Sequence, residues 1–94
     1  MPAYWIAHVE VTDADAYGKY AALAGPAIAK HGGKFLARAG RYVQLEGNDR
    51  ARNVVVEFPT LEGAVACYNS PEYTEARSHA DGASVRDLMV VEGV

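Results

Sequence analysis

The order in which two apolar patterns follow one another most constrains the fold of this 94-residue chain. Residues 3–11 (AYWIAHVEV) alternate between apolar side chains and a mixed set that includes His8 and Glu10. A period of two predicts a strand. Residues 14–31 instead place apolar side chains three and four positions apart, which predicts a helix that Gly32 ends.

A hairpin is predicted in the middle of the chain. Alternation puts Lys34, Leu36 and Arg38 on one side of a second strand, and Gly40 predicts a bulge after it. The chain then continues in extended form, turns at glycine and asparagine, and returns as a strand rich in β-branched residues. The second strand is predicted at 34–39, the extended stretch at 41–46, the turn at 47–49 and the returning strand at 52–58.

Two further helices and a last strand complete the pattern, with Thr60 and Ser70 as helix caps. The order is that of a ferredoxin-like βαββαβ fold of the α+β class, with a four-stranded antiparallel sheet and the helices on one face. The chain has room for a single domain, residues 1–94. The helices are predicted at 61–68 and 71–79, and the strand at 85–92.

The second face of this sheet is left without a cover. Tyr4 and Ile6 lie on it, and alternation adds Leu36. An apolar sheet face without helices is covered most economically by a second copy of the same chain. The sequence therefore predicts a homodimer.

Composition excludes several classes of partner. Nine basic and twelve acidic residues give a formal net charge of −3, so no global positive field attracts nucleic acid or an anionic membrane. No signal peptide and no apolar segment of membrane-spanning length is found, and the lone Cys67 cannot form an internal disulfide. We expect a cytoplasmic protein that binds neither nucleic acid nor membrane.

The chain as a whole resembles the bacterial family known as domain of unknown function 1330, in the dimeric α+β barrel superfamily. The resemblance rests on four stretches of sequence. It implies a ferredoxin-like protomer whose sheet packs face to face with that of its partner, and it implies no particular reaction. The four stretches are AYWIAHVEVTD, KHGGKFLARAG, RNVVVEFPTLEGAVACYNSPEY and VVEGV.

Candidate site residues come from the helices and from the second strand. His31 at the end of the first helix is the candidate catalytic acid or base, since histidine titrates near neutral pH. Aromatic side chains on the inner helix faces predict a pocket for a small ligand, although aromatic residues at helical spacing are more often plain core. The candidate ligand-binding residues are Tyr17, Tyr20, Tyr68 and Tyr73, with Arg38 as the charged anchor.

A second polar group is predicted on the face toward the partner subunit. His8 and Glu10 lie two residues apart on one strand face, and Asp87 or Arg38 joins them depending on strand register. This group is either a site or an ion-pair network that secures the dimer. The spacing of the three histidines fits no metal site, and nucleotide, serine-hydrolase and zinc motifs are absent, so we expect no cofactor.

Two functions remain from these observations. The first is a homodimer that binds a small aromatic or acidic metabolite in a pocket between helices and sheet, with cofactor-free catalysis as an option. The second is a non-enzymatic binding or assembly domain.

Overall fold

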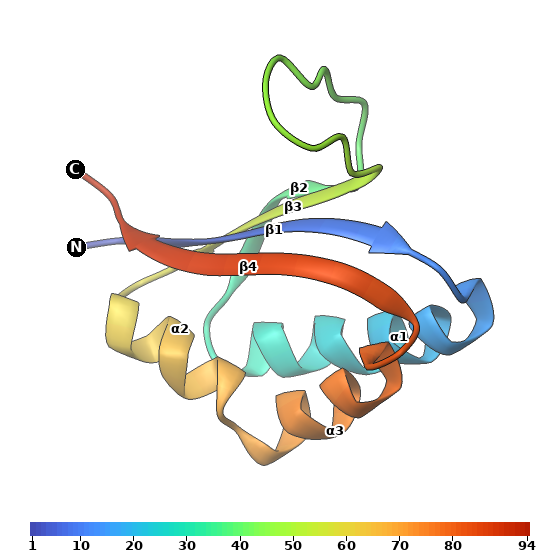
Figure 1. Cartoon of the computed structure of the whole chain (residues 1–94). Helices are drawn as coiled ribbons and strands as arrows, with labels where there is room; N and C mark the ends of the chain where they lie inside the picture. The colour runs from blue at the N-terminus through green and yellow to red at the C-terminus, as the bar shows by residue number, and fades with distance from the viewer.

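The computed structural model describes residues 1–94 as a four-stranded antiparallel sheet with three helices on one side of it (Figure 1). The strand order is β2-β3-β1-β4, so β1 pairs with β3 and with β4. This confirms the predicted ferredoxin-like α+β fold. The strands are β1 (Ala3–Val11), β2 (Lys34–Arg38), β3 (Arg52–Phe58) and β4 (Ser84–Glu92), and the helices are α1 (Ala14–Lys30), α2 (Leu61–Tyr68) and α3 (Pro71–Ala80).

Helix ends follow the signals in the sequence. Asp13, Thr60 and Ser70 each accept a hydrogen bond from the backbone N–H three residues further on, at 2.9 to 3.2 Å. These bonds satisfy backbone donors that a first helical turn leaves free. At the other end of α1, Gly32 takes a φ of 85°, a left-handed conformation that glycine adopts without steric cost.

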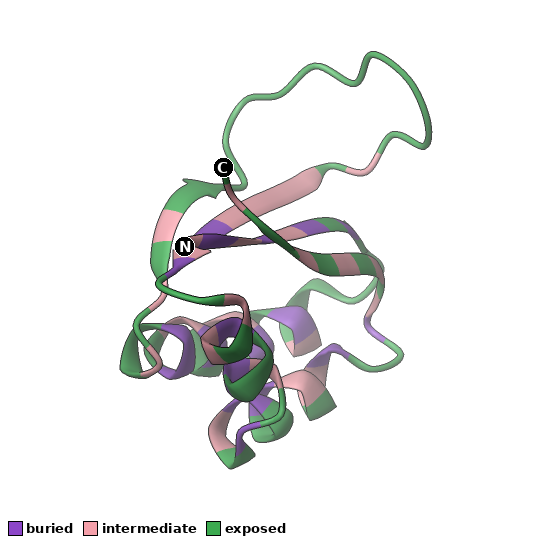
Figure 2. Cartoon of the chain, turned by 90° about the vertical axis from the view of Figure 1, so that its left-hand side faces the viewer, coloured by how far each residue is buried: buried purple, intermediate pink, exposed green.

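The core lies between the middle of the sheet and the helices. Trp5 on β1 is 2% exposed and pairs with Val56 and Val90 on the neighbouring strands, all on the helix side. Its ring meets that of Tyr73 edge-on, at 5.0 Å between centroids, and lies 5.7 Å from that of Phe58. Figure 2 shows the buried residues gathered in the helices and the middle of the sheet.

A bulge in β2 reverses one prediction about side-chain direction. The pairing of β2 with β3 shifts between Phe35 and Ala37, so Phe35 and Arg38 both face the helices. The prediction that Arg38 shares a face with Lys34 was therefore wrong, because the extra residue, Leu36, changes the alternation. The bulge occurs within β2 and not at Gly40.

Residues 39–51 form a loop where extended chain was predicted over 41–46. Ala39 has a φ of 55°, which ends β2 although its N–H still donates to the Asn53 carbonyl at 2.9 Å. No strand follows until β3, so the predicted hairpin has a long loop instead of a tight turn. The loop projects from the sheet on the side away from the helices (Figure 1).

The sheet face opposite the helices, called here the open face, is apolar over much of its area. The β1–β4 register places Ile6 opposite Met89 on this face. Met89 is 50% exposed, so the open face is accessible to solvent along β4. The apolar side chains of the open face are Ile6, Val55, Val85, Met89 and Val91.

The three helices include no apolar segment of membrane-spanning length.

Candidate functional site

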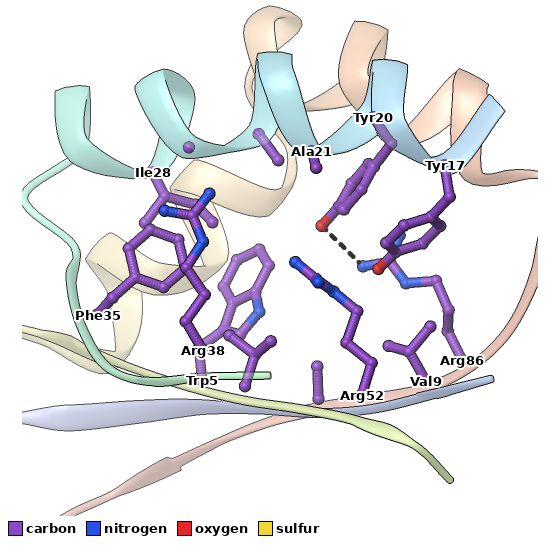
Figure 3. A pocket seen from close by; sticks show the side chains of 14 residues that line it. Trp5, Val9, Tyr17, Tyr20, Ala21, Ile28, Phe35, Arg38, Arg52 and Arg86 are labelled. Carbon is purple, nitrogen blue, oxygen red and sulfur yellow. Dashed lines mark hydrogen bonds between the residues drawn. The ribbon is translucent and has the colours of Figure 1, made fainter. Parts of the chain in front are cut away.

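Three arginines from three different strands face the same side of helix α1. Arg52 on β3 and Arg86 on β4 both pair with Val9 of β1, one from each side, and Arg38 follows on the edge strand β2. Because paired residues share a face of the sheet, all three side chains lie on the helix side. Figure 3 shows their guanidinium groups in the space between the sheet and α1.

These arginines line a cavity between the sheet and α1. The space open to the centres of water-sized molecules is about 30 Å³, and one water needs roughly 10–15 Å³ by that measure. The cavity opens at the edge of the sheet, since β2 is an edge strand and Arg38 is exposed. Its other walls are Trp5, Ala7, Val9, Tyr17, Tyr20, Ala21, Ala24, Gly25, Ile28, Phe35 and Val54.

The inner end of the cavity is a hydrogen-bonded group of Arg86 and two phenols. Arg86 Nη2 donates to the hydroxyl of Tyr73 at 2.8 Å and to that of Tyr20 at 3.1 Å. The two hydroxyls lie 2.7 Å apart. Tyr20 comes from α1 and Tyr73 from α3, so this group joins both helices to β4.

The phenols of this group stay protonated near neutral pH. Burial raises the pKa of Tyr17, Tyr20 and Tyr73 above the ordinary value of tyrosine. Burial opposes the charge of Arg86, but its interactions with Tyr20 and Tyr73 outweigh this and raise its pKa. The cavity thus contains neutral hydroxyls and a fixed positive charge. None of these phenols is ionised, so none acts as a general base.

Arg52 and Arg38 have guanidinium N–H donors available to a ligand. Arg52 lies over the ring of Tyr17, at 5.4 Å, and its Nε is buried without a hydrogen-bond partner. Arg38 lies over the ring of Phe35, at 4.3 Å, and its Nη2 is 3.2 Å from where a β-carbon on Gly25 would stand. Stacking on rings leaves the edges of both guanidinium groups available to an acceptor.

No carboxylate balances these charges. The cavity walls include no aspartate or glutamate, and the ion pairs of the chain join Lys30, His31 and Arg50 to acids elsewhere. Arg52 and Arg86 are partly buried and Arg38 is exposed, and charges that lose water on burial are normally paired. Three guanidinium groups around one small cavity without an acid therefore form a site suited to an anion.

His31 lies outside this cavity, at the C-terminal end of α1. Its Nε2 is 3.6 Å from Oε2 of Glu72 on α3, and Lys30 Nζ is 2.5 Å from the other carboxylate oxygen. The predicted catalytic histidine is thus one of two basic groups around Glu72, and the cavity walls do not include it. Its role as an acid or base stays a prediction.

The contacts of Glu72 with Lys30 and His31 can be tested through the pH dependence of stability. The hydrogen bond from Lys30 lowers the pKa of Glu72 from 4.5 to about 2, so its contribution to stability is present above pH 4.5 and is lost as the pH falls towards 2. Glu72→Gln is expected to lower the melting temperature slightly at pH 7, with a difference that shrinks below pH 4.5. Glu75→Gln on the same helix, where no ion pair forms, is the control. Equal differences at pH 7 and pH 3 would contradict the assignment.

The polar group predicted on the open face is assembled in part. His8 lies between Asn53 and Asp87 on the neighbouring strands, and its Nδ1 is 2.6 Å from Oδ1 of Asn53. Asp87 accepts from Nε of Arg50 at 3.0 Å. Glu10 lies two residues further along the same face. Arg38 does not join this group, because the bulge turns it to the helix side.

The predicted tyrosines divide between two places. Tyr17 and Tyr20 line the cavity, and Tyr73 meets Arg86 behind it. Tyr68 instead accepts a hydrogen bond from Arg77 at 2.9 Å, beside a hollow between α3 and β4.

Sequence reasoning missed Arg52 and Arg86. Each is a single charged residue in a row of apolar residues two positions apart. Arg86, for example, shares its side of the strand with Leu88 and Val90. The opposite face of β4 is also largely apolar, so alternation alone does not tell which face is buried.

The other polar candidates offer no metal site. No three histidine, cysteine, aspartate or glutamate side chains come together in a way that could hold a metal ion. Cys67 is fully buried, and burial raises the pKa of its thiol to about 11. It behaves as a small apolar residue, as its position on the inner face of α2 indicates.

The sequence matches one family model over nearly its whole length. Residues 2–94 match the family described as domain of unknown function (DUF1330), which confirms the resemblance found in the sequence. No curated protein sequence matches the chain.

Several solved structures share the fold at low sequence identity. A protein of unknown function from Rhodopseudomonas palustris has a TM-score of 0.80 at 22% identity, over 99% of this chain and 82% of that one. A dimeric ferredoxin-like protein of unknown function from Bacteroides fragilis has a TM-score of 0.67 at 14% identity, over 98% and 96%. SnoaB, a cofactor-independent oxygenase from Streptomyces nogalater, has a TM-score of 0.65 at 12% identity, over 99% and 93%.

Proposed function

The chain belongs to the family described as domain of unknown function (DUF1330), and we propose that it binds a small carboxylic acid in the cavity between α1 and the sheet. The observation behind this proposal is the group formed by Arg38, Arg52 and Arg86, which has no acidic partner. Arginine pairs with carboxylates through two parallel hydrogen bonds, and such charge-assisted bonds are the stronger kind.

The size of the cavity supports a carboxylate as the buried part of the ligand. About 30 Å³ for molecular centres holds roughly two waters, and the two oxygens of a carboxylate take up comparable space. The remainder of the ligand then extends towards the open end, beside Phe35 and Arg38. Arg52, whose Nε is without a partner, is the residue that the carboxylate meets inside.

The proposal is one of binding without a reaction. The phenols around the cavity are held protonated by burial, and His31 lies at the far end of α1 and outside the cavity walls. The similarity to SnoaB is one of fold, and fold alone does not transfer an activity.

The protein is also proposed to act as a homodimer that pairs through the open face. Ile6, Val55 and Met89 form an apolar area there, and the loop 39–51 projects on the same side (Figure 1). That loop exposes apolar side chains as well, with Val43 at 79% and Leu45 at 87%. Exposed apolar areas of this kind are typical of interaction surfaces, and the similar structure from Bacteroides fragilis is described as dimeric.

Matched pairs of acids and amides test the proposed ligand class. Benzoate and phenylacetate are titrated against benzamide and phenylacetamide by calorimetry. Each charge-assisted hydrogen bond is worth about 1.5–3 kcal/mol, so the acids are expected to bind at least about tenfold more tightly, and less tightly at high salt. Equal affinity for acid and amide would exclude an arginine site.

Two glycines of α1 provide matched variants for the same titration. An added β-carbon at Gly25 meets Arg38 Nη2 at 3.2 Å, whereas one at Gly18 meets nothing within 4 Å. Alanine raises helix stability by about 1 kcal/mol at Gly18, and by less at Gly25, because a residue with a β-carbon before Pro26 is disfavoured in the helical conformation. Gly25→Ala is therefore expected to weaken acid binding by displacing Arg38, and Gly18→Ala to leave it unchanged. Equal affinities in the two variants would remove Arg38 from the site.

A further inference from the structure

A second hollow lies on the other side of Trp5, between the helices α2 and α3 and the edge strand β4. Its apolar part, of about 410 Å³, is lined entirely by hydrophobic residues. Its polar part, of about 260 Å³, shares Tyr68 and Leu88 with the apolar part, so the two lie side by side. We call the whole the α2 groove. Its walls are Trp5, Leu61, Val65, Tyr68, Arg77, Asp81, Arg86, Leu88, Met89 and Val90.

The apolar end of the α2 groove is accessible. Val65 on α2, which lines this end, is 45% exposed. The ring of Tyr68 stands in the wall with one face towards Trp5, at 5.9 Å between centroids. A volume of several hundred Å³ with hydrophobic walls and a few polar groups is typical of small-molecule sites.

The polar end of the groove has an excess of positive charge. Arg77 lies over the ring of Tyr68, at 4.6 Å, and donates to its hydroxyl, so its guanidinium is held in place. Arg86 reaches the same end, and neither arginine has a carboxylate within ion-pair distance. Asp81 at the end of α3 is the one acid in the walls. Two guanidinium groups against one carboxylate leave a net positive charge there.

We propose that the α2 groove is a second binding site, for an acid with a flat apolar body such as an arylcarboxylate. The body lies against Val65, Leu88 and the ring of Tyr68, and the carboxylate meets Arg77 and Arg86. This site is separate from the cavity of the proposed function, with which it shares only Trp5 and Arg86. An acid too large for that cavity fits this groove.

Binding of 2-naphthoate, with 2-naphthalenemethanol as its neutral analogue, tests the groove. Titration of the full chain is followed by backbone NMR shifts and by the fluorescence of Trp5, the only tryptophan. Shifts are expected around Leu61, Val65 and Leu88. Arg77→Gln is expected to weaken 2-naphthoate about tenfold, as loss of a charge-assisted hydrogen bond does, and to leave the alcohol unchanged.

Two aspartate variants separate the groove from other surfaces. Val65→Asp replaces an exposed side chain, so folding is preserved, and it is expected to abolish binding of both probes. Leu23→Asp on α1, beside α3 and away from the groove, replaces a leucine that is 38% exposed and is expected to change nothing.

Each of several other results would contradict the proposal that the α2 groove binds an acid. Shifts centred on Gly25 and Arg52, with Arg77→Gln without effect, would place 2-naphthoate in the cavity and leave the proposed function standing. Shifts on the open face around Ile6 would show adsorption there. A change of molecular mass in Val65→Asp would make the groove an interface between copies, and no binding at millimolar concentration would remove the site.

Discussion

Replacing Arg52 by methionine is expected to make the ligand-free protein more stable and to weaken its affinity for small acids. The Nε of Arg52 is buried without a partner, between two other guanidinium groups and beside Val9 and Tyr17. An uncompensated charge in such a place costs folding free energy, and an apolar side chain of similar length removes that cost.

The variant is expected to gain stability and to lose affinity, and a residue that only supports the fold would not give this combination. A gain of about 1 kcal/mol corresponds to a rise of roughly 4–8 °C in the melting temperature of a domain of this size. Loss of the charged donor is expected to weaken acid binding by at least about tenfold. Thermal unfolding without ligand and calorimetry with benzoate measure the two effects separately.

Arg41→Met is the control for this variant. Arg41 lies in the exposed loop 39–51, so the same substitution changes net charge without touching the cavity. It is expected to leave both the melting temperature and the affinity near those of the unchanged chain. If Arg52→Met lowers the melting temperature and leaves benzoate binding intact, Arg52 supports the fold and the cavity is not the acid site.

Replacing Ile6 by aspartate is expected to convert the protein from a dimer to a monomer. Ile6 lies on the central strand, paired with Val55 on one side and Met89 on the other, in the middle of the open face. In a face-to-face dimer the aspartate would be buried without a partner, and its ionised carboxylate would have to lose its water. In a monomer it would remain in solvent at little cost.

Molecular mass in solution measures this change. The unchanged chain is expected to have twice its 10.1 kDa, and the Ile6→Asp variant 10.1 kDa, with a circular dichroism spectrum that is unaltered. Leu23→Asp on the helix side is the control and is expected to remain dimeric. A monomeric unchanged chain, or a dimeric Ile6→Asp variant, would mean that another surface pairs the subunits.

The candidate site was predictable in part. Tyr17 and Tyr20 follow from helical spacing alone, because positions three apart on a helix share a face whatever the helix packs against. Arg38 was chosen as the charged anchor, but on an alternation that placed it on the opposite side of the sheet. The alternation failed because a bulge adds one residue to β2 without any clear sign in the sequence.

What the sequence determined by itself is local: the segments that form helices and strands, the caps that begin the helices, and their ferredoxin-like order. These depend on periodicity and on side chains a few residues apart, such as Ser70 and the backbone of Tyr73. The meeting of Arg38, Arg52 and Arg86 was decided only by the tertiary structure. β4 is largely apolar on both faces and a bulge breaks the alternation of β2, so the register of pairing decides which side of these two strands meets the helices.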